Sequence, residues 1–293
     1  MTKFLDKNGL QTVLIGVGTA LGKKINAPTG GTVGQVLTKT DEGTEWRTVA
    51  SVNGCSCEDL TSPELDEIMK GMASTSVAYV DLGLPSGNLW ATCNLGAEKE
   101  TDSGLYFQWG DVKGYKGACQ ESESDGNDDA HYFNWSKYKF GTRNDLTKYC
   151  TQSSYGVVDN KTVLEAEDDA VVAALGGNWK MPTAEDFQEL IDNTDPGDGA
   201  NEYDWIEDYN GTGINGLLLK SKTNDNTIFF PASGYCGGSS LEDVGQGGYY
   251  WSSSLYSSDS NDGQGLYFGS GVLEVDGDTR FGGLPVRGVL SGK

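Results

Sequence analysis

The chain has 293 residues, 42 of them glycine, and a formal net charge of −22. This length suits one large domain with a smaller appendage, because single cores rarely grow beyond about 300 residues. The negative charge argues against binding to nucleic acid or to anionic lipid headgroups, since both attract basic surfaces. No apolar run reaches the roughly 20 residues of a membrane-spanning helix, so we expect no membrane insertion.

Residues 1–50 are predicted to attach and trimerise the chain. Asp6 lies where a secretion signal carries positive charge, so we interpret the apolar run that follows as packing surface. Residues at spacings of four and three suit one stripe of a short self-associating helix: Leu10, Leu14, Val17 and Leu21. Residues 51–76 are predicted to be a linker with a short helix capped by Ser62.

Residues 77–293 are predicted to form the main domain. Thr183 can cap a helix whose third position is Asp186. Strands followed by helices and then more strands predict an α+β, strand-rich domain with two helices. The periodicity and turn signals predict a hairpin at 78–84 and 87–92, a surface loop at 111–129, helices at 163–175 and 183–191, and strands at 216–222, 227–231, 248–254, 265–268 and 286–290.

The cysteines and the single histidine show no metal-site spacing. The six cysteines stand at positions 55, 57, 93, 119, 150 and 236, without the paired ligands of a zinc site. We expect free or buried thiols, because a chain without a secretion signal folds in a reducing cytoplasm. His131 lies in an acidic loop, where we expect it to be solvated and not to act as a general base.

A segment near the start resembles parts of phage tail proteins. Gly34–Lys39 (GQVLTK), followed by Glu45 and Trp46, is similar to segments that recur in tail-fibre and tail-tip proteins. In those proteins the segments lie in intertwined trimeric regions near the attachment end. The resemblance implies a homotrimer, N-terminal contacts with other phage tail proteins, and a place in the virion at the tail tip or fibre after assembly in the host cytoplasm. The alternative is an ordinary turn-and-strand linker.

Six further segments resemble one family, the Fibrobacter succinogenes major paralogous domain. They are Tyr79–Ala97, Tyr106–Gly110, Asp168–Ala170, Gly176–Thr183, Phe230–Tyr235 and Tyr250–Ser254. The resemblance implies a C-type-lectin fold of the formylglycine-generating-enzyme subtype. Members of this family in gut phages and Bacteroides-like bacteria are often targets of diversity-generating retroelements, which rewrite a C-terminal segment by mutating adenines. A phage receptor-binding protein that sets host tropism, with a variable segment at about 252–288, is therefore expected.

The composition of that segment agrees with adenine mutation. Random substitution at the adenines of asparagine codons never produces Lys, Glu, Gln, Met or Trp. Residues 252–288 contain no Lys, Met or Trp, and only Gln264 and Glu274 depart from the pattern. The alternative is a glycine-rich loop that happens to lack lysine.

The predicted binding face combines outward side chains with a buried scaffold. Tyr256 and Phe281 are the expected aromatic anchors, with core membership as the alternative. The residues expected to contact ligand are Tyr256, Asp259, Ser260, Asn261, Asp262, Gln264, Gly269, Gly271, Leu273, Glu274, Asp276, Gly277, Asp278, Thr279, Phe281 and Leu284. The expected scaffold residues are Trp251, Tyr267, Phe268, Val272, Arg280, Val286 and Arg287, with the two arginines pairing with nearby acids.

The acidic face leaves several partners open. It favours a cationic protein patch or hydrogen bonds to a sugar, so the expected partner is a host bacterial surface protein or glycan. No cofactor is expected; calcium at Asp276 and Asp278 is an alternative, although their spacing fits no EF-hand and a solvated loop is favoured.

Catalysis is not expected from this chain. The enzyme that gives the fold subtype its name uses a reactive cysteine pair near its C-terminal end, whereas this chain has only Cys236 after Cys150. The alternative functions are a bacterial surface adhesin or carbohydrate-binding module of the same fold, and a structural virion decoration protein.

Overall fold

The computed structural model describes residues 35–40, 43–48, 77–116, 118–119, 130–195 and 205–292. Contacts divide the chain into two units, Met1–Val77 with Leu175–Gly177, and Ala78–Ala174 with Asn178–Lys293. In the first unit, β1 (Gln35–Thr40) and β2 (Gly43–Thr48) form an antiparallel hairpin. The helices predicted within residues 1–25 and 51–76 lie outside the described residues.

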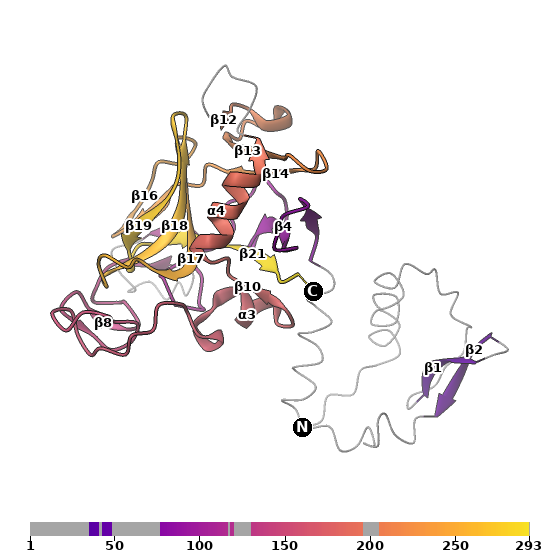
Figure 1. The fold of residues 1–293 in the computed structure, drawn as a ribbon, viewed down its shortest axis with the longest axis horizontal. Coiled ribbons are helices and arrows are strands. Elements are labelled where there is room, and N and C mark those ends of the chain that lie inside the picture. The colour runs from indigo at the N-terminus through magenta and orange to yellow at the C-terminus, as the bar shows by residue number, and fades with distance from the viewer. Residues whose placement is uncertain are drawn as a thin grey trace. The chain divides into compact units, whose positions relative to one another are not determined.

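The second unit is a strand-rich, mixed α+β assembly of open sheets (Figure 1). None of the described helices is long and apolar enough to cross a membrane. Its shorter elements are β5 (Tyr106–Phe107), β6 (Ala118–Cys119), β7 (Ala130–His131), β8 (Gly141–Thr142), β9 (Asp145–Leu146), β15 (Tyr235–Gly237), β16 (Ser240–Glu242), β20 (Leu284–Pro285) and the 3-10 helices η2 (Ala166–Asp168) and η3 (Tyr209–Gly211).

One four-stranded sheet joins the two ends of this unit. Its order is β10 (Trp179–Lys180), β21 (Arg287–Leu290), β4 (Leu89–Asn94) and β3 (Tyr79–Asp81). The antiparallel pairing of β3 with β4 confirms the predicted hairpin. Because β21 lies between β10 and β4, residues near the C-terminus are part of the framework that the first strands build.

A second sheet is centred on β13 (Gly216–Ser221). One edge of β13 pairs with β14 (Thr227–Pro231), and the other pairs with β11 (Thr194–Asp195) and β12 (Trp205–Ile206). Both predicted strands in this region are confirmed, and the apolar side chains of Leu217, Leu219 and Phe230 explain them because they are buried.

The third sheet contains most of the segment predicted to vary. It runs β17 (Gly247–Leu255), β18 (Asp262–Gly269) and β19 (Val272–Thr279), all antiparallel (Figure 1). The strands at 248–254 and 265–268 are confirmed and are longer than predicted. The strand β19 was not predicted, because Asp276, Gly277 and Asp278 belong to residue types that are depleted in strands.

The helix α4 (Ala184–Asn193) follows the sequence prediction closely. The Thr183 hydroxyl caps it by accepting a 3.1 Å hydrogen bond from the Asp186 backbone nitrogen, and the Asp186 carboxylate accepts a 2.8 Å bond from the Thr183 backbone nitrogen. Phe187 and Leu190 are buried and pack among core residues that include side chains of the third sheet. The predicted capping box is confirmed.

The other predicted helix is shorter than expected. The range 163–175 resolves into η2 and the single-turn helix α3 (Ala170–Leu175). Asp169 stands between them, and its carboxylate accepts hydrogen bonds from the nitrogens of Val171, Val172 and Met181 at 2.8–3.0 Å. These bonds cap the start of α3, so the helix does not extend back through Asp169.

A core of fourteen buried side chains, among the residues that the structure describes, lies between the sheets and α4. Its buried members are Leu82, Leu84, Trp90, Phe187, Leu190, Leu217, Leu219, Ile228, Phe230, Ala232, Tyr250, Leu266, Phe268 and Val289. Burial of each large apolar side chain stabilises the folded state by roughly 1.5–3 kcal/mol, so this core holds the strands of all three sheets in place.

Two tryptophans connect segments that are far apart in the sequence. The Trp251 indole nitrogen donates a 2.8 Å hydrogen bond to the Phe107 carbonyl, and the Trp109 indole nitrogen donates a 3.0 Å bond to the Ser252 carbonyl. Both tryptophans are fully buried. The reciprocal bonds hold β17 against the chain near β5.

The predicted states of the cysteines and of His131 need correction. Cys93 and Cys150 are free thiols, as expected, but Cys236 is disulfide-bonded. His131 is buried, not solvated, because its ring stacks on Tyr115 with 4.1 Å between ring centroids. Its Nε2 also lies 3.3 Å from the side-chain oxygen of Gln108.

Candidate ligand-binding face

The third sheet separates core side chains from outward side chains. On β18, Leu266 and Phe268 face the core, and Tyr267 between them faces the opposite side. On β19, Glu274 is opposite Tyr267 in the register, so it lies on that same outer side. Strand alternation thus places Tyr267, Glu274, Asp276 and Asp278 together on the outer face of the sheet.

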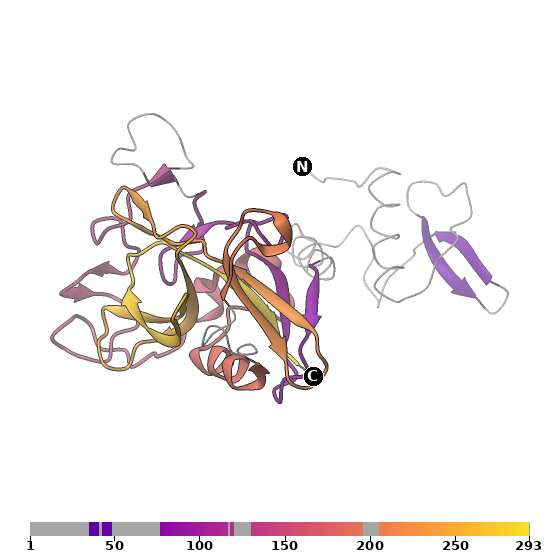
Figure 2. The ribbon, with the colours of Figure 1, turned by 90° about the horizontal axis from the view of Figure 1, so that it is seen from above.

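The loop after β17 is fastened to the region between residues 131 and 165, and Figure 2 shows these two parts beside each other. Thr151 and Ser260 hydroxyl oxygens lie 3.0 Å apart, and the Thr151 nitrogen donates to Ser260 at 3.1 Å. The Tyr155 hydroxyl donates to Asp259 at 3.3 Å. These hydrogen bonds restrict the backbone of the loop next to the sheet.

The predicted contact residues fall into three groups by burial. Gly271, Glu274 and Asp276 are exposed. Ten are partly buried: Tyr256, Asp259, Asp262, Gln264, Gly269, Leu273, Gly277, Asp278, Thr279 and Phe281. Ser260, Asn261 and Leu284 are buried, so the prediction that they point outward is wrong.

Each buried exception has a structural reason. Ser260 is held by its bonds to Thr151. The Asn261 carbonyl accepts a 3.0 Å hydrogen bond from the Arg280 nitrogen, which draws Asn261 beneath the loop. Leu284 belongs to β20, which pairs with β5, and it is fully enclosed. Leu273 is a milder case, since it packs against the main core from β19.

The two expected aromatic anchors are partly structural. The Tyr256 ring lies over Gly277, so closely that a Cβ on Gly277 would come within 2.7 Å of it. The Phe281 ring packs edge-on to Trp135, with 5.5 Å between centroids. Tyr256 and Phe281 are both partly exposed, so each combines a packing contact with some solvent-accessible surface.

The predicted scaffold is largely buried, with two exceptions. Trp251, Phe268, Val286, Arg280 and Arg287 are all buried. Val272 is 39% exposed and does not hold the strands by burial, because it lies at the turn between β18 and β19. Tyr267 is only partly buried, because it lies on the outer face.

The predicted pairing of the two arginines with acids is also wrong. The Arg280 guanidinium donates to the carbonyl oxygens of Lys148 and Tyr149 and lies 4.8 Å from the Trp109 ring centroid. Arg287 donates to backbone carbonyls and to the side chain of Asn94. Both buried arginines therefore stabilise the fold through hydrogen bonds to backbone carbonyls.

Crowded acids dominate the electrostatics of the face. Burial, together with the charges of Asp259 and Asp278, raises the pKa of Asp262 to about 6, against the opposing charge of Arg280. Burial also raises the pKa of Asp278. The nearby hydroxyl of Tyr267 is desolvated, and its pKa is raised by burial and by the charge of Asp278. The outer face is thus poor in positive charge.

Two tyrosines on this face were not predicted. Tyr249 of β17 is opposite Tyr267, and Tyr235 of β15 packs against Tyr249. The alternation Gly248, Tyr249, Tyr250 in β17 could have revealed Tyr249, because Tyr250 is a core residue and its neighbour must face the other way.

The described residues hold one group of acids close enough to share a metal ion, Glu165, Glu167 and Asp168, whose oxygens lie within 4.8 Å of one another. The Lys148 ammonium already contacts all three, at 2.5–2.8 Å. Asp276 and Asp278 do not form such a group with a third described ligand, so calcium at these two positions stays an untested expectation.

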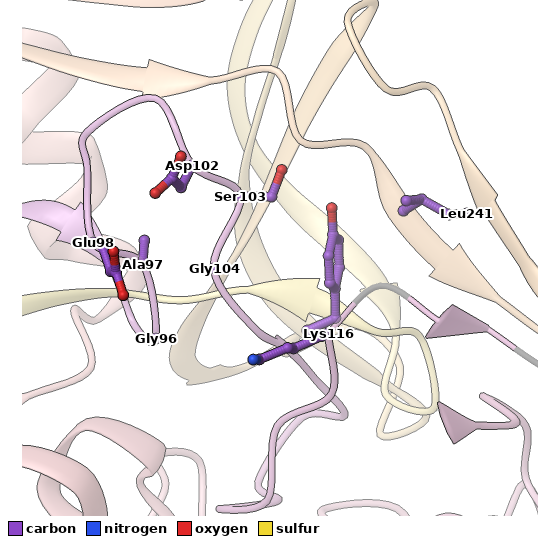
Figure 3. Close-up of a pocket in the computed structure, with 9 residues that line it drawn as sticks. Gly96, Ala97, Glu98, Asp102, Ser103, Gly104, Lys116 and Leu241 are labelled. Carbon is purple, nitrogen blue, oxygen red and sulfur yellow. The ribbon is translucent and has the colours of Figure 1, made fainter. Parts of the chain in front are cut away.

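The structure also has a hollow of about 440 Å³ (Figure 3). Its lining residues are Gly96, Ala97, Glu98, Asp102, Ser103, Gly104, Tyr106, Lys116 and Leu241. The Tyr106 hydroxyl is engaged, since it donates a 2.6 Å hydrogen bond to the Ser233 carbonyl. No residue of the predicted contact set lines this hollow.

Fold and face together define a mixed α+β protein with a strand-borne, acidic and tyrosine-rich surface over a rigid framework. No protein family, curated protein or solved structure matches the chain.

Proposed function

We propose that this chain is a phage receptor-binding protein with a C-type-lectin-like fold and a diversified C-terminal face that binds a host surface molecule without catalysis. The observation that carries the proposal is the division of roles along β18 and β19. Leu266 and Phe268 are enclosed in the core, whereas Glu274 and Asp276 are exposed. The one hydrogen bond described for the Asp276 side chain is local, to the Gly277 nitrogen at 2.8 Å.

Such a division suits a surface that must change without altering the backbone. The backbone of β19 is held by an eight-residue pairing with β18, so its outward side chains do not set its path. Substitutions at exposed strand positions usually change stability by less than about 0.5 kcal/mol. Adenine mutation of this segment would therefore alter recognition more than folding.

The fold proposal is supported by how the family-like segments meet. Tyr250 donates a 2.7 Å hydrogen bond to the Pro231 carbonyl, and the Ser253 nitrogen donates a 2.7 Å bond to the Pro182 carbonyl. These residues come from three of the segments that resemble the paralogous domain. The similar residues are thus the ones that build the framework.

The assembly proposal rests on the N-terminal resemblance. A homotrimer attached to the virion through its N-terminal segment would present three faces together. Linked binding of this kind raises avidity by about 10²- to 10⁴-fold when the target has repeated epitopes. A weak face is then sufficient for attachment to a host surface protein or glycan.

Binding to intact cells and surface extracts of gut Bacteroides-like bacteria tests the proposal. We would compare the full chain with a face variant, Glu274→Thr with Asp276→Tyr, and with a matched control, Glu185→Thr with Glu207→Tyr. The control residues are exposed and lie outside the third sheet. The proposal predicts that the natural chain and the control bind at least one strain and that the face variant binds it at least tenfold more weakly.

Two results would overturn it. If the face variant binds as tightly as the natural chain, the face does not contribute to recognition. If the trimeric full-length chain binds none of the strains, the proposed receptor-binding function is wrong.

A further inference from the structure

Three tyrosines and one aspartate from four strands lie together on the outer face. We call Tyr235, Tyr249, Tyr267 and Asp278 the Tyr–Asp cluster. The rings of Tyr235 and Tyr249 are 5.0 Å apart at an angle of 66°, and those of Tyr249 and Tyr267 are 5.4 Å apart at 88°. All four side chains are partly exposed, so a ligand can reach them.

Asp278 lies on the same outer side of the sheet as Tyr249 and Tyr267, because Gly263, its partner in β18, is four residues from Tyr267. Beyond the effect of burial, its charge contributes to raising the pKa of Tyr235, Tyr249 and Tyr267. The one hydrogen bond described for its carboxylate comes from the backbone nitrogen of Thr279 at 2.6 Å. The charged form of a half-buried carboxylate is poorly stabilised when it accepts so few hydrogen bonds.

Two carboxylates that accept from the tyrosine hydroxyls add to the negative character of the site. Tyr249 donates to Asp243 at 2.8 Å and Tyr235 donates to Glu242 at 3.1 Å, so two further carboxylates lie at the edge of the cluster. The Tyr267 hydroxyl is buried and has no hydrogen-bond partner among the described residues. It is a desolvated polar group within the cluster that no described residue compensates.

Among the residues that the structure describes, no basic side chain forms an ion pair with Asp278. The sequence has no lysine, arginine or histidine between Lys222 and Arg280. Arg280 is fully buried and its guanidinium donates to the carbonyls of Lys148 and Tyr149. The described salt bridges of this unit lie in other regions.

Aromatic rings around a carboxylate are the surroundings that bind organic cations in proteins, because the ring faces are electron-rich. We infer that the Tyr–Asp cluster binds a cationic side chain, a lysine ammonium or an arginine guanidinium, on a protein ligand. This inference rests on the proposed function and narrows its partner from any surface molecule to a protein with exposed basic residues. A neutral sugar would leave Asp278 without a counter-charge.

Peptide binding by the full chain tests the chemistry without a known receptor. The probes are immobilised peptides of alternating lysine and glycine, the same peptides with acetylated lysines, and a neutral glycan surface of mannan. The variants are Asp278→Asn and Tyr267→Phe, with Asp225→Asn as the control. Asp225 is exposed in another sheet turn, and its substitution changes the net charge by the same amount as that of Asp278.

We expect binding to the lysine peptides, with acetylation or Asp278→Asn weakening it about tenfold, the effect of one charge-assisted hydrogen bond. Tyr267→Phe should leave binding within about twofold, because it keeps the ring, while raising the melting temperature, since it removes a buried unpaired hydroxyl. Asp225→Asn should have little effect. Equal losses in Asp278→Asn and Asp225→Asn would show only general charge attraction and would overturn the inference, as would tighter binding to mannan.

Bacterial binding separates this inference from the proposed function. If the chain binds cells through the face but acetylating the cell-surface lysines and blocking the arginines changes nothing, the cationic contact is wrong and the receptor-binding proposal stands. If the lysine peptides bind at Asp278 but no bacterium does, the contact stands and the receptor-binding proposal fails.

Discussion

Arg287, whose side chain has no exposed surface, donates a 2.8 Å hydrogen bond from Nε to the side-chain oxygen of Asn94. Its other nitrogens donate to the carbonyls of Ala91, Thr92 and Phe229. One side chain from the C-terminal strand thus satisfies backbone groups of two sheets.

Replacing this arginine should destabilise the fold strongly. Arg287→Met keeps much of the side-chain volume but leaves several buried oxygens without donors, so the free energy of unfolding should fall by about 3–5 kcal/mol. Urea denaturation would measure it, with the exposed Arg143→Met changing stability by less than about 0.5 kcal/mol. A loss in Arg287→Met below about 1 kcal/mol would contradict this role.

The contact between Tyr256 and Gly277 predicts a coupled pair of substitutions. Gly277→Ala should cost about 1–3 kcal/mol, because the new methyl group meets the Tyr256 ring. In a Tyr256→Ala background the same change should cost much less, and a double-mutant cycle measures the difference. Gly271→Ala is the control, since open space surrounds Gly271. Additive costs would show that the ring does not rest on Gly277.

Protonation of Asp262 should stabilise the folded protein in mild acid. Its pKa is raised to about 6 in the folded state, so the folded chain binds the proton more tightly than the unfolded chain. The stabilisation is full below the unfolded pKa of about 4 and is lost as the pH rises through 6.

Asp262→Asn removes this dependence. Because the side chain is only half-buried, solvent screening limits the effect, and the variant should gain about 1 kcal/mol over the natural chain at pH 7 and none at pH 4. Melting temperatures of the two proteins across that range would check it. A constant difference at every pH would contradict the assignment.

Lys148 should support stability with the opposite pH dependence. Burial tends to raise the pKa of Asp168, but hydrogen bonds from Lys139, Lys148 and Tyr149 outweigh it and hold that pKa below its usual range. The stabilisation is therefore present above about pH 4 and is lost as the pH falls through the folded pKa. Lys148→Met should cost about 1 kcal/mol at pH 7 and much less at pH 2 in denaturant titrations, whereas Lys99→Met, at an exposed lysine, should cost little at either pH.

Local sequence signals were sufficient where the side chains themselves decide the structure. Thr183 and Asp186 predicted the start of α4 because a capping box needs only residues three apart. The hairpin of β3 and β4 was predicted for the same reason, from alternation and a turn.

The missed features depend on contacts between distant residues. The strand β19 forms because β18 provides a hydrogen-bonding edge, although Asp276 and Gly277 disfavour a strand. Ser260 is buried because its hydroxyl hydrogen-bonds to the backbone nitrogen and hydroxyl of Thr151, more than a hundred positions away. Neither partner can be identified from local composition.

The alternation of side chains along a strand was sufficient to predict part of the site. Glu274 and Asp276 follow the outward phase of β19 and are exposed, as expected of ligand contacts. Tyr235 was missed because it reaches this face through the pairing of Gly234 with Gly248, which local alternation cannot reveal.

Selection from a library tests the central claim most directly. Glu274, Asp276 and Asp278 would be randomised together on the displayed full chain and selected on bacterial strains that the natural chain does not bind. The account predicts variants that gain new strains while resisting protease as well as the natural chain does. A library whose members lose protease resistance, or stay folded and never gain a strain, would contradict it.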